Sequence, residues 1–216
     1  YHTAIIKKDS SLWMCGSNEY GQLGDNTTQS RLKPVSISEF LVKTQRISAN
    51  SRVVSISKKR FNIGAKTNGN GKLTYTTSNK AVATVDAAGK VTVKGPGVAK
   101  ITVKAAATTD YKAASKTVTV TVAPKKQSIS LVNKIKKQLT IKWKKNTKAS
   151  GYQVVYSTNK KFTGKKTVRK AKTTTSYKIK GLKKGKKYYV KVRSYKTVNG
   201  KRIYGAYSTA KKATIK

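Results

Sequence analysis

Apolar and polar residues alternate in short runs along much of the chain, which is the period of β-strands with one buried face. The clearest run lies at residues 182–195. Its two alternating sets are Tyr188, Val190 and Val192 on one side and Tyr189, Lys191 and Arg193 on the other. We expect a strand here, with the first set entering a core and the second set facing solvent.

The same alternation fills the rest of residues 125–216. Apolar positions spaced by two predict strands around Ile129–Leu131, Leu139–Trp143, Tyr152–Tyr156, Val168, Tyr177–Ile179 and Ile203–Tyr204. The pair Asn199-Gly200 marks a hairpin turn of the type that requires positive φ. Leu182, Gly185 and Tyr188 stand at the spacing of a tyrosine corner, in which a Tyr hydroxyl pins the chain entering a sandwich strand. These signals together predict a β-sandwich.

Residues 51–124 also carry short strands at even spacing. They are expected at Val53–Ile56, Leu73–Thr77, Val82–Val85, Val91–Val93, Val98–Val103 and Val118–Val122. Turn signals such as Gly69–Gly71 and Gly95–Gly97 separate these runs. This spacing predicts another β-sandwich, which Pro124 closes before the basic linker Lys125-Lys126.

Charge changes this picture more than the rest of the composition does. The chain has 49 Lys and Arg against 6 Asp and Glu, which gives a net charge of +43 at pH 7. No acidic residue follows Asp110, whereas 30 of the basic residues lie in 125–216. Such an imbalance favours anionic partners: nucleic acid, teichoic acids, acidic glycans or an anionic membrane surface. A solvated lysine-rich surface that only keeps the protein soluble is the alternative.

Several classes of protein are excluded by what the sequence lacks. Cys15 is the one cysteine, so an intrachain disulfide is impossible, and no stretch is apolar enough to span a bilayer. A Ser-His-Asp set, a Cys-x-x-Cys motif and a phosphate-binding loop are all absent, and His2 is the single histidine. We therefore predict no enzyme activity, no catalytic residues, no cofactor, no metal and no small-molecule substrate.

Residues 1–37 carry a different kind of motif. The run Leu12–Gly24 reads Leu-Trp-x-x-Gly-x-Asn-x-x-Gly-Gln-Leu-Gly. It resembles one regulator-of-chromosome-condensation repeat, the blade unit of a seven-bladed propeller, with Ser10 in place of the usual turn glycine. The resemblance implies that Trp13 and Leu23 are core residues. One blade cannot bury both of its faces, so we expect earlier blades, and any export signal, upstream of residue 1.

The blade motif is followed by a polar connection with one apolar patch. This patch, Phe40-Leu41-Val42, fits either an outer strand of the blade or a brief helical turn. Its periodicity does not distinguish the two.

Within residues 51–124, a set of positions resembles the bacterial immunoglobulin-like group 2 domain: Ser78-Asn79, Val82–Asp86, Gly89, Val91, Gly97, Ala99 and Ile101. The resemblance implies tight turns at the glycines and a turn-capping carboxylate at Asp86. A calcium site at Asp86 is the alternative, but few carboxylates are available to complete it.

Residues 125–216 are similar to a fibronectin type III domain. The similarity rests on Trp143, Tyr152 and the corner ending at Tyr188. The run Tyr204–Ser208 further resembles the Lys-rich variants found in surface proteins of Gram-positive gut bacteria. The integrin-binding tripeptide of some animal members is absent, so that activity is not implied.

Alternation also indicates where the cations of this domain point. The candidate polyanion-binding residues are Tyr189, Lys191, Arg193, Lys142 and Lys144. The first three are expected outside one sheet beside Gln153 and Val155, and the two lysines outside the other sheet, flanking Trp143. An aromatic among cations suits a shallow surface for an acidic sugar or phosphate polymer. In the alternative, Tyr189 and Val155 are an ordinary cross-strand pair and the lysines only protect a sheet edge.

The predicted fold class is all-β, with two β-sandwiches in series after a single β-propeller blade fragment. The expected domains are residues 1–50, the propeller-repeat fragment and linker, residues 51–124, the bacterial immunoglobulin-like domain, and residues 125–216, the fibronectin type III domain. This order is typical of a modular bacterial surface protein, with an extracellular or cell-surface location.

We predict a non-catalytic stalk and adhesion module without membrane insertion. Its expected partners are anionic cell-wall polymers or acidic host glycans, with other surface proteins as a further possibility. One alternative is an accessory region of a larger secreted enzyme. A second is nucleic-acid binding, for which the sequence lacks helix-turn-helix, zinc-finger and single-strand-binding signatures.

Overall fold

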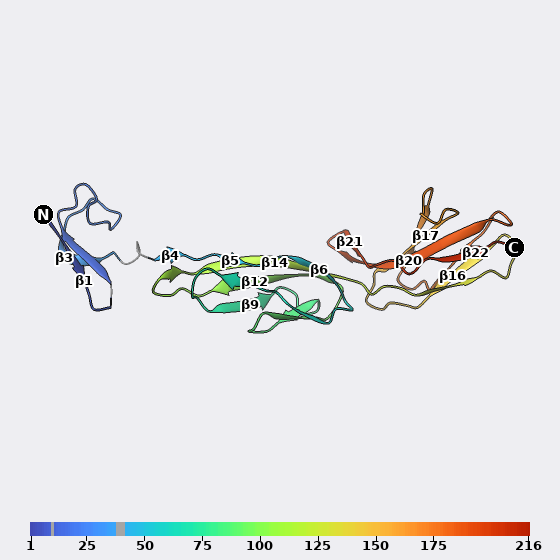
Figure 1. The fold of residues 1–216 in the computed structure, drawn as a ribbon, viewed down its shortest axis with the longest axis horizontal. Helices are drawn as coiled ribbons and strands as arrows, with labels where there is room; N and C mark the ends of the chain where they lie inside the picture. Colours follow the sequence, from blue (N-terminus) through green and yellow to red (C-terminus); the bar gives the residue numbers. More distant parts are fainter. Residues whose placement is uncertain (10, 38–41) are drawn as a thin grey trace. The chain divides into compact units, whose positions relative to one another are not determined.

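The computed structural model describes residues 1–9, 11–37 and 42–216 (Figure 1). All regular secondary structure in these described residues is β-strand, β1 to β22, which confirms the all-β fold. No helix within it is long and apolar enough to cross a bilayer. The chain divides into two compact units, which are described separately. Unit one comprises Tyr1–Ser48, Lys66–Thr74 and Val103–Lys116, and unit two comprises Ala49–Ala65, Tyr75–Thr102 and Thr117–Lys216.

Unit one begins with the predicted blade, a three-stranded antiparallel sheet in the order β1-β2-β3. Its strands are β1 (His2–Ile6), β2 (Leu12–Gly16) and β3 (Arg31–Ser36). The small core of this sheet consists of Met14, Leu23 and Ile37, with Leu12 packed against it. Leu23 is fully buried, as predicted.

Trp13 is not part of this small core. Its indole is half-exposed, and the Lys7 ammonium lies 3.4 Å from the ring centroid. The indole Nε1–H donates to Ser11 Oγ at 2.8 Å. Trp13 alternates with the buried Met14, so it lies on the opposite face of β2 from the small core.

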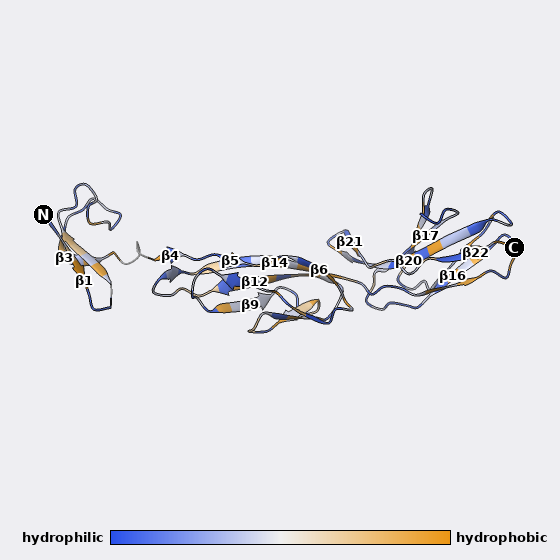
Figure 2. Cartoon of the chain, in the orientation of Figure 1, coloured by the Kyte–Doolittle hydropathy of each residue, from blue (hydrophilic) through white to orange (hydrophobic). Residues whose placement is uncertain are grey.

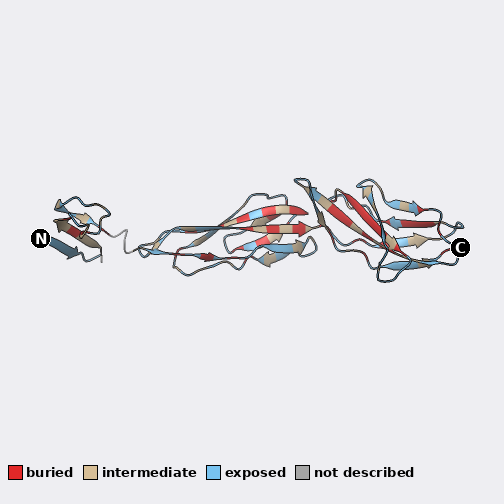
Figure 3. Ribbon diagram, turned by 90° about the horizontal axis from the view of Figure 1, so that it is seen from above, coloured by how far each residue is buried: buried red, intermediate tan, exposed pale blue. Residues whose placement is uncertain are grey.

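The blade exposes an unusual amount of apolar surface. Every residue of β1 is exposed, including Ile5 and Ile6, and so are Tyr1 and Leu32. Figure 2 shows hydrophobic colouring on β1, and Figure 3 marks the same strand as exposed. This surface agrees with the expectation that one blade needs a neighbour to cover its second face.

In the rest of unit one, a buried glutamine, Gln45, lies between two short pairs of strands. The parallel pair β4 (Lys43–Thr44) and β13 (Tyr111–Lys112) lies on one side of it, and the antiparallel pair β5 (Ile47–Ser48) and β8 (Lys66–Thr67) on the other.

This residue, Gln45, is 2% exposed. Its Nε2 donates to Ala106 O at 2.7 Å and to Lys112 O at 2.8 Å, and its Oε1 accepts from Thr67 Oγ1 at 3.1 Å. Residues 43–48 therefore pair with strands of the first sandwich, whereas its start at residue 51 stays a prediction. Phe40 and Leu41 lie outside the described residues, and Val42 is in neither strand nor helix.

The first sandwich continues into unit two and has two sheets. The larger sheet follows the order β6-β14-β12-β9, and the smaller follows β10-β11-β7. The strands are β6 (Arg52–Ser55), β7 (Arg60–Asn62), β9 (Leu73–Thr77), β10 (Ala83–Val85), β11 (Lys90–Val93), β12 (Gly97–Ala105) and β14 (Ala114–Ala123). Every expected run is a strand, and β7 adds one that the pattern did not indicate.

The first and last strands of this sandwich are hydrogen-bonded neighbours that run in the same direction. The parallel register of β6 and β14 pairs Arg52 with Val120 and Ser55 with Ala123. In β14 the buried residues Val118, Val120 and Val122 alternate with partly exposed ones, which is the period the sequence shows.

The second sandwich lies within unit two and also has two sheets. One follows the order β15-β16-β19, and the other follows β18-β17-β20-β21, with β22 paired to β20 as well. The strands are β15 (Ile129–Val132), β16 (Leu139–Trp143), β17 (Gly151–Ser157), β18 (Lys166–Ala171), β19 (Ser176–Ile179), β20 (Lys187–Val198), β21 (Lys201–Tyr204) and β22 (Lys211–Thr214). Figure 3 shows buried and intermediate positions alternating along the long central strand.

Side chains from both sheets form one core in the second sandwich. Tyr152, Val154, Val190 and Val192 are fully buried in it. Trp143 is 6% exposed, and its ring centroid lies 5.4 Å from that of Tyr152. The strand expected around Tyr188–Arg193, which is part of β20, is therefore central to this core.

The turn before β20 is held mainly by backbone groups. Leu182 is buried, and its N–H donates to Lys137 O at 3.0 Å. Gly185 has a φ of 75°, a conformation that favours glycine, and its N–H donates to Ile215 O at 2.9 Å. Tyr188 packs against the core. The chain is thus anchored at the expected position through these amides; among the described residues the Tyr188 hydroxyl makes no hydrogen bond of the kind the corner motif implied.

We expect Gln45→Ala to destabilise the protein strongly. The substitution removes three partly buried hydrogen bonds, each worth about 0.5–1.5 kcal/mol, and leaves a cavity where the buried Gln45 side chain was. Urea unfolding of the full chain should show a free energy of unfolding lower by about 2–5 kcal/mol. Arg46→Ala, which removes the exposed side chain next to Gln45, is the control and should change it by under about 0.5 kcal/mol. Equal effects of the two substitutions would contradict the role of Gln45.

Candidate polyanion-binding surface

The five candidate residues lie on two different sheets of the second sandwich. Tyr189, Lys191 and Arg193 are on β20, whereas Lys142 and Lys144 belong to β16 and the residue after its end. Both strands turn their buried residues into one shared core, so their outward residues face in opposite directions. Both lysines of the β16 set are exposed, as expected. The structure does not bring the two sets together into one site.

Lys191 and Arg193 are both stacked on aromatic rings. The Lys191 ammonium lies 4.0 Å from the centroid of the Phe162 ring and 4.5 Å from that of Tyr207. The Arg193 guanidinium lies 4.3 Å from the Tyr207 centroid and 3.8 Å from that of Tyr204. We call this series a cation–π ladder; its members are Phe162, Lys191, Tyr207, Arg193 and Tyr204.

Gln153 fixes the middle of the ladder. Its Oε1 accepts from Arg193 Nε at 2.7 Å and from the Tyr207 hydroxyl at 3.0 Å. Gln153 is directly opposite Arg193 in the antiparallel register of β17 and β20, and it is only 8% exposed. One amide oxygen therefore holds a cation and the ring stacked on it in a single arrangement.

The structure differs from the expectation for Val155 and Tyr189, which were predicted to lie on the outer face of the sheet, with a cross-strand pair between them as the alternative. Val155 is 1% exposed and lies opposite Lys191, so it is covered and does not face solvent. Tyr189 lies opposite Ser157 on β17 and Lys212 on β22, so it is not the cross-strand partner of Val155. The outer face of this sheet is a packed layer under the ladder and not a bare strand surface.

Sequence reasoning missed the aromatic members of the ladder. Tyr204 and Tyr207 come from the end of β21 and the connection to β22, and Phe162 comes from the β17–β18 connection with a φ of 62°. The spacing Tyr-x-x-Tyr around Gly205 was the available signal. Such a loop motif has no period, so alternation does not reveal where its rings go.

A basic groove is lined by none of the ladder residues. It is a cavity of about 290 Å³ between residues 125–128 and residues 144–147. Its charged lining residues are Lys125, Lys126, Lys144 and Lys145, and all four are exposed. A neighbouring cavity of about 340 Å³, lined partly by Lys142, Trp143 and Lys144, extends it. Two of the five candidate residues therefore border this region.

Three acidic side chains, Asp9, Asp25 and Asp86, accept local hydrogen bonds. Asp86 Oδ1 accepts from Ala88 N at 3.0 Å and from Lys90 N at 2.9 Å, which confirms the turn-capping prediction. The described residues contain no group of three or more His, Cys, Asp or Glu able to hold a metal ion. His2 is exposed at a strand start and pairs with Gly16 in the sheet, and Cys15 is half-buried.

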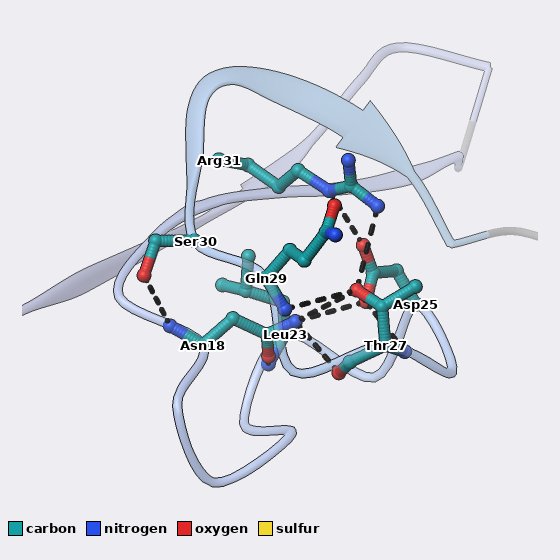
Figure 4. Close-up of polar contacts among 7 residues, drawn as sticks. All are labelled: Asn18, Leu23, Asp25, Thr27, Gln29, Ser30 and Arg31. Atoms are coloured by element: carbon teal, nitrogen blue, oxygen red, sulfur yellow. Dashed lines mark hydrogen bonds and ion pairs between the residues drawn. The ribbon is translucent and has the colours of Figure 1, made fainter.

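The other polar cluster of the described chain lies in the blade loop before β3 (Figure 4). Asn18 is fully buried, donates to Asp25 Oδ1 at 3.0 Å and accepts from Leu23 N at 2.8 Å. Asp25 also accepts from Thr27 Oγ1 at 2.7 Å and from Arg31 Nε at 2.8 Å. The hydrogen bonds that link Asn18, Asp25, Thr27 and Arg31 therefore close the blade loop.

Comparisons with known proteins match three families along the chain, in the expected order. Family models match residues 9–57 for the regulator of chromosome condensation repeat, 64–108 for the immunoglobulin-like domain of intimin, and 122–209 for the fibronectin type III domain. The three modules expected from the sequence are thus present, and the matching immunoglobulin-like family is that of intimin. No curated protein matches the chain.

Solved structures similar to the chain are single β-sandwich domains. A computationally redesigned β-sandwich protein is 14% identical over 42% of this chain and 94% of its own, with a TM-score of 0.35. The sixth fibronectin type III domain of human fibronectin type III domain containing protein 3 is 16% identical over 43% of this chain and 86% of its own, with a TM-score of 0.36. The fibronectin type III domain of human contactin 1 is 15% identical over 41% of this chain and 74% of its own, with a TM-score of 0.37.

We expect acid to open the blade loop at a pH well below the usual range for aspartate. Hydrogen bonds from Thr27 and Arg31 lower the pKa of Asp25 to about 2. Because the pKa is lower in the folded loop than in an unfolded chain, where it is about 3.9, this stabilisation is complete above pH 4. It is lost as the pH falls from about 4 to about 2.

The amide NMR signals of Leu23 and Thr27, followed from pH 5 to pH 1.5, test this expectation. The control is Asp25→Asn, in which the step between pH 4 and pH 2 should be absent. A step of equal size in both proteins would show that another group opens the loop.

We expect the cation–π ladder to stabilise the second sandwich. Tyr207→Leu removes two ring–cation contacts and one hydrogen bond, a loss of about 1.5–3 kcal/mol. Tyr207→Phe removes the hydrogen bond alone and should cost about 1 kcal/mol.

Urea unfolding followed by Trp143 fluorescence in a Trp13→Phe background measures both effects. Tyr20→Leu, at a 91% exposed tyrosine of the blade, is the control and should leave this transition unchanged. A Tyr207→Leu protein as stable as its parent would show that the ring contacts contribute nothing.

Proposed function

We propose that this chain is a non-catalytic stalk and adhesion module of a bacterial surface or secreted protein, held electrostatically to anionic wall polymers or acidic host glycans. Immunoglobulin-like and fibronectin type III domains are typical of modular extracellular proteins, and all three matched families are non-catalytic kinds of domain. The modules support an extracellular place for the chain. The charge of the chain indicates the class of polymer that it binds.

The observation that carries the proposal is the charge of the second sandwich. Residues 125–216 contain 30 Lys and Arg and no Asp or Glu. Cations brought to a polyanion release the counterions condensed on it, and this release favours binding. The protein has no acidic surface within that domain to compete for the cations.

Salt-dependent retention tests the proposal. The full chain is applied to columns carrying teichoic acid, heparin, double-stranded DNA or neutral dextran, and is eluted with a NaCl gradient. We expect retention on teichoic acid or heparin at 50 mM NaCl, none on dextran, and a linear fall of log affinity with log salt.

Two outcomes would contradict this function. The first is flow-through on both acidic polymers at 50 mM NaCl. The second is later elution from DNA than from either polymer at equal charge density, which would make the chain a nucleic-acid binder. The neutral dextran column controls for binding to the matrix.

A further inference from the structure

We propose that the basic groove between residues 125–128 and 144–147 is the specific oxyanion site of the second sandwich. It would take successive sulfate or phosphate ester groups of a linear polymer. The inference rests on the proposed function and adds to it a location, which differs from the aromatic and basic face of β20 that the strand pattern favours.

The groove combines cations from two separate segments. Lys125 and Lys126 come from the segment that leads into β15, and Lys144 and Lys145 follow the end of β16. None of these four ammonium groups has a carboxylate nearby in sequence, because no acidic residue follows Asp110. A ligand oxyanion would therefore meet cations that no internal ion pair neutralises.

Buried polar groups hold both walls of the groove in place. The Ser194 hydroxyl, fully buried on β20, donates to Lys125 O at 3.2 Å. Its oxygen accepts from Gln127 Nε2 and from Asn146 Nδ2, each at 3.4 Å. The Asn146 N–H in turn donates to the Tyr152 hydroxyl at 2.6 Å. One hydroxyl thus connects the two segments whose lysines line the groove.

The segment that carries Lys125 and Lys126 is also in close contact with Gly205. Gly205 donates its N–H to Ser194 O at 2.9 Å, and a Cβ at this position would lie 2.5 Å from Pro124 O. The backbone just before Lys125 is therefore in close contact with the end of β21. A backbone fixed before binding loses little conformational freedom when a ligand arrives, which raises affinity.

Adjacent cavities continue the groove along the domain. One shares Ser128 and Lys144 with it and adds Lys142, and another shares Lys126 and Gln127 and adds Lys211. A track with further lysines on both sides suits a polymer with repeated charges better than a single small anion.

The ladder is a weaker candidate for the same ligand. Lys191 and Arg193 are half-buried, and each is stacked between two rings. Arg193 Nε is also already donating to Gln153. An oxyanion there would have to displace contacts that hold the sheet face together, whereas the groove lysines are free of such contacts with aromatic rings among the described residues.

The test compares two quadruple variants of the full chain that lose the same charge. The groove variant replaces Lys125, Lys126, Lys144 and Lys145 by Gln. The control variant replaces Lys160, Lys161, Lys165 and Lys166, exposed residues at the other end of β17, by Gln. Affinity for heparin and for teichoic acid, measured by titration at 100 mM NaCl, distinguishes a sulfated from a phosphorylated source.

We expect the groove variant to bind its preferred polymer about a hundredfold more weakly, with a shallower salt dependence, and the control to lose under about fivefold. NMR titration of the unmodified chain with a heparin oligosaccharide or a teichoic acid fragment should shift the side-chain amides of Gln127 and Asn146 before the Arg193 Nε–H.

Equal losses in the two variants would overturn the groove and leave electrostatic binding intact. First shifts at Arg193 and Tyr207 would place the ligand on the ladder instead. Failure of the unmodified chain to bind either polymer would remove the proposed function and the groove together. These results are distinguishable because the first two require that the unmodified chain binds.

Discussion

The second sandwich has no acidic side chains, and this absence determines how its cations are accommodated. A domain with 30 cations and no acid cannot balance charge by ion pairs, and the one ion pair of the described chain, between Arg31 and Asp25, lies in the blade. Each cation must therefore remain in water or lie against a neutral group with high electron density. Tyrosine rings and one glutamine oxygen fill that second role around Lys191 and Arg193.

Contacts between cations and aromatic rings also occur elsewhere in this sandwich. The Lys170 ammonium lies 4.3 Å from the centroid of the Tyr177 ring, and the Arg202 guanidinium lies 5.5 Å from that of Tyr195. The ring of Tyr195 also meets that of Tyr204 edge-on at 5.7 Å. For these four cations, Lys170, Lys191, Arg193 and Arg202, aromatic rings take the place that Asp and Glu have in ion pairs, without reducing the net charge of the domain.

The strands were predictable where one face is buried against a core, because burial imposes a period of two. The runs at Leu73–Thr77 and Leu139–Trp143 are strands with those bounds. The short pairs around Gln45 were not predictable, because a single buried amide and not an alternating face holds them. For the same reason the sequence indicated that Lys142 and Lys144 face outward, but not that Ser194 connects two lysine-bearing segments. Such contacts depend on residues far apart in the chain and leave no local pattern.

The parallel pairing of β6 with β14 has a mechanical consequence. These strands begin and end the first sandwich, and they are hydrogen-bonded side by side in the same direction from Arg52–Val120 to Ser55–Ala123. When a force pulls on the chain before β6 and after β14, it slides the two strands past each other in opposite directions. The hydrogen bonds between them then share the load and must break together, whereas an antiparallel terminal pair would open one bond at a time. The pairing that closes this sheet is therefore loaded in shear, and not in peeling, when the chain is under tension.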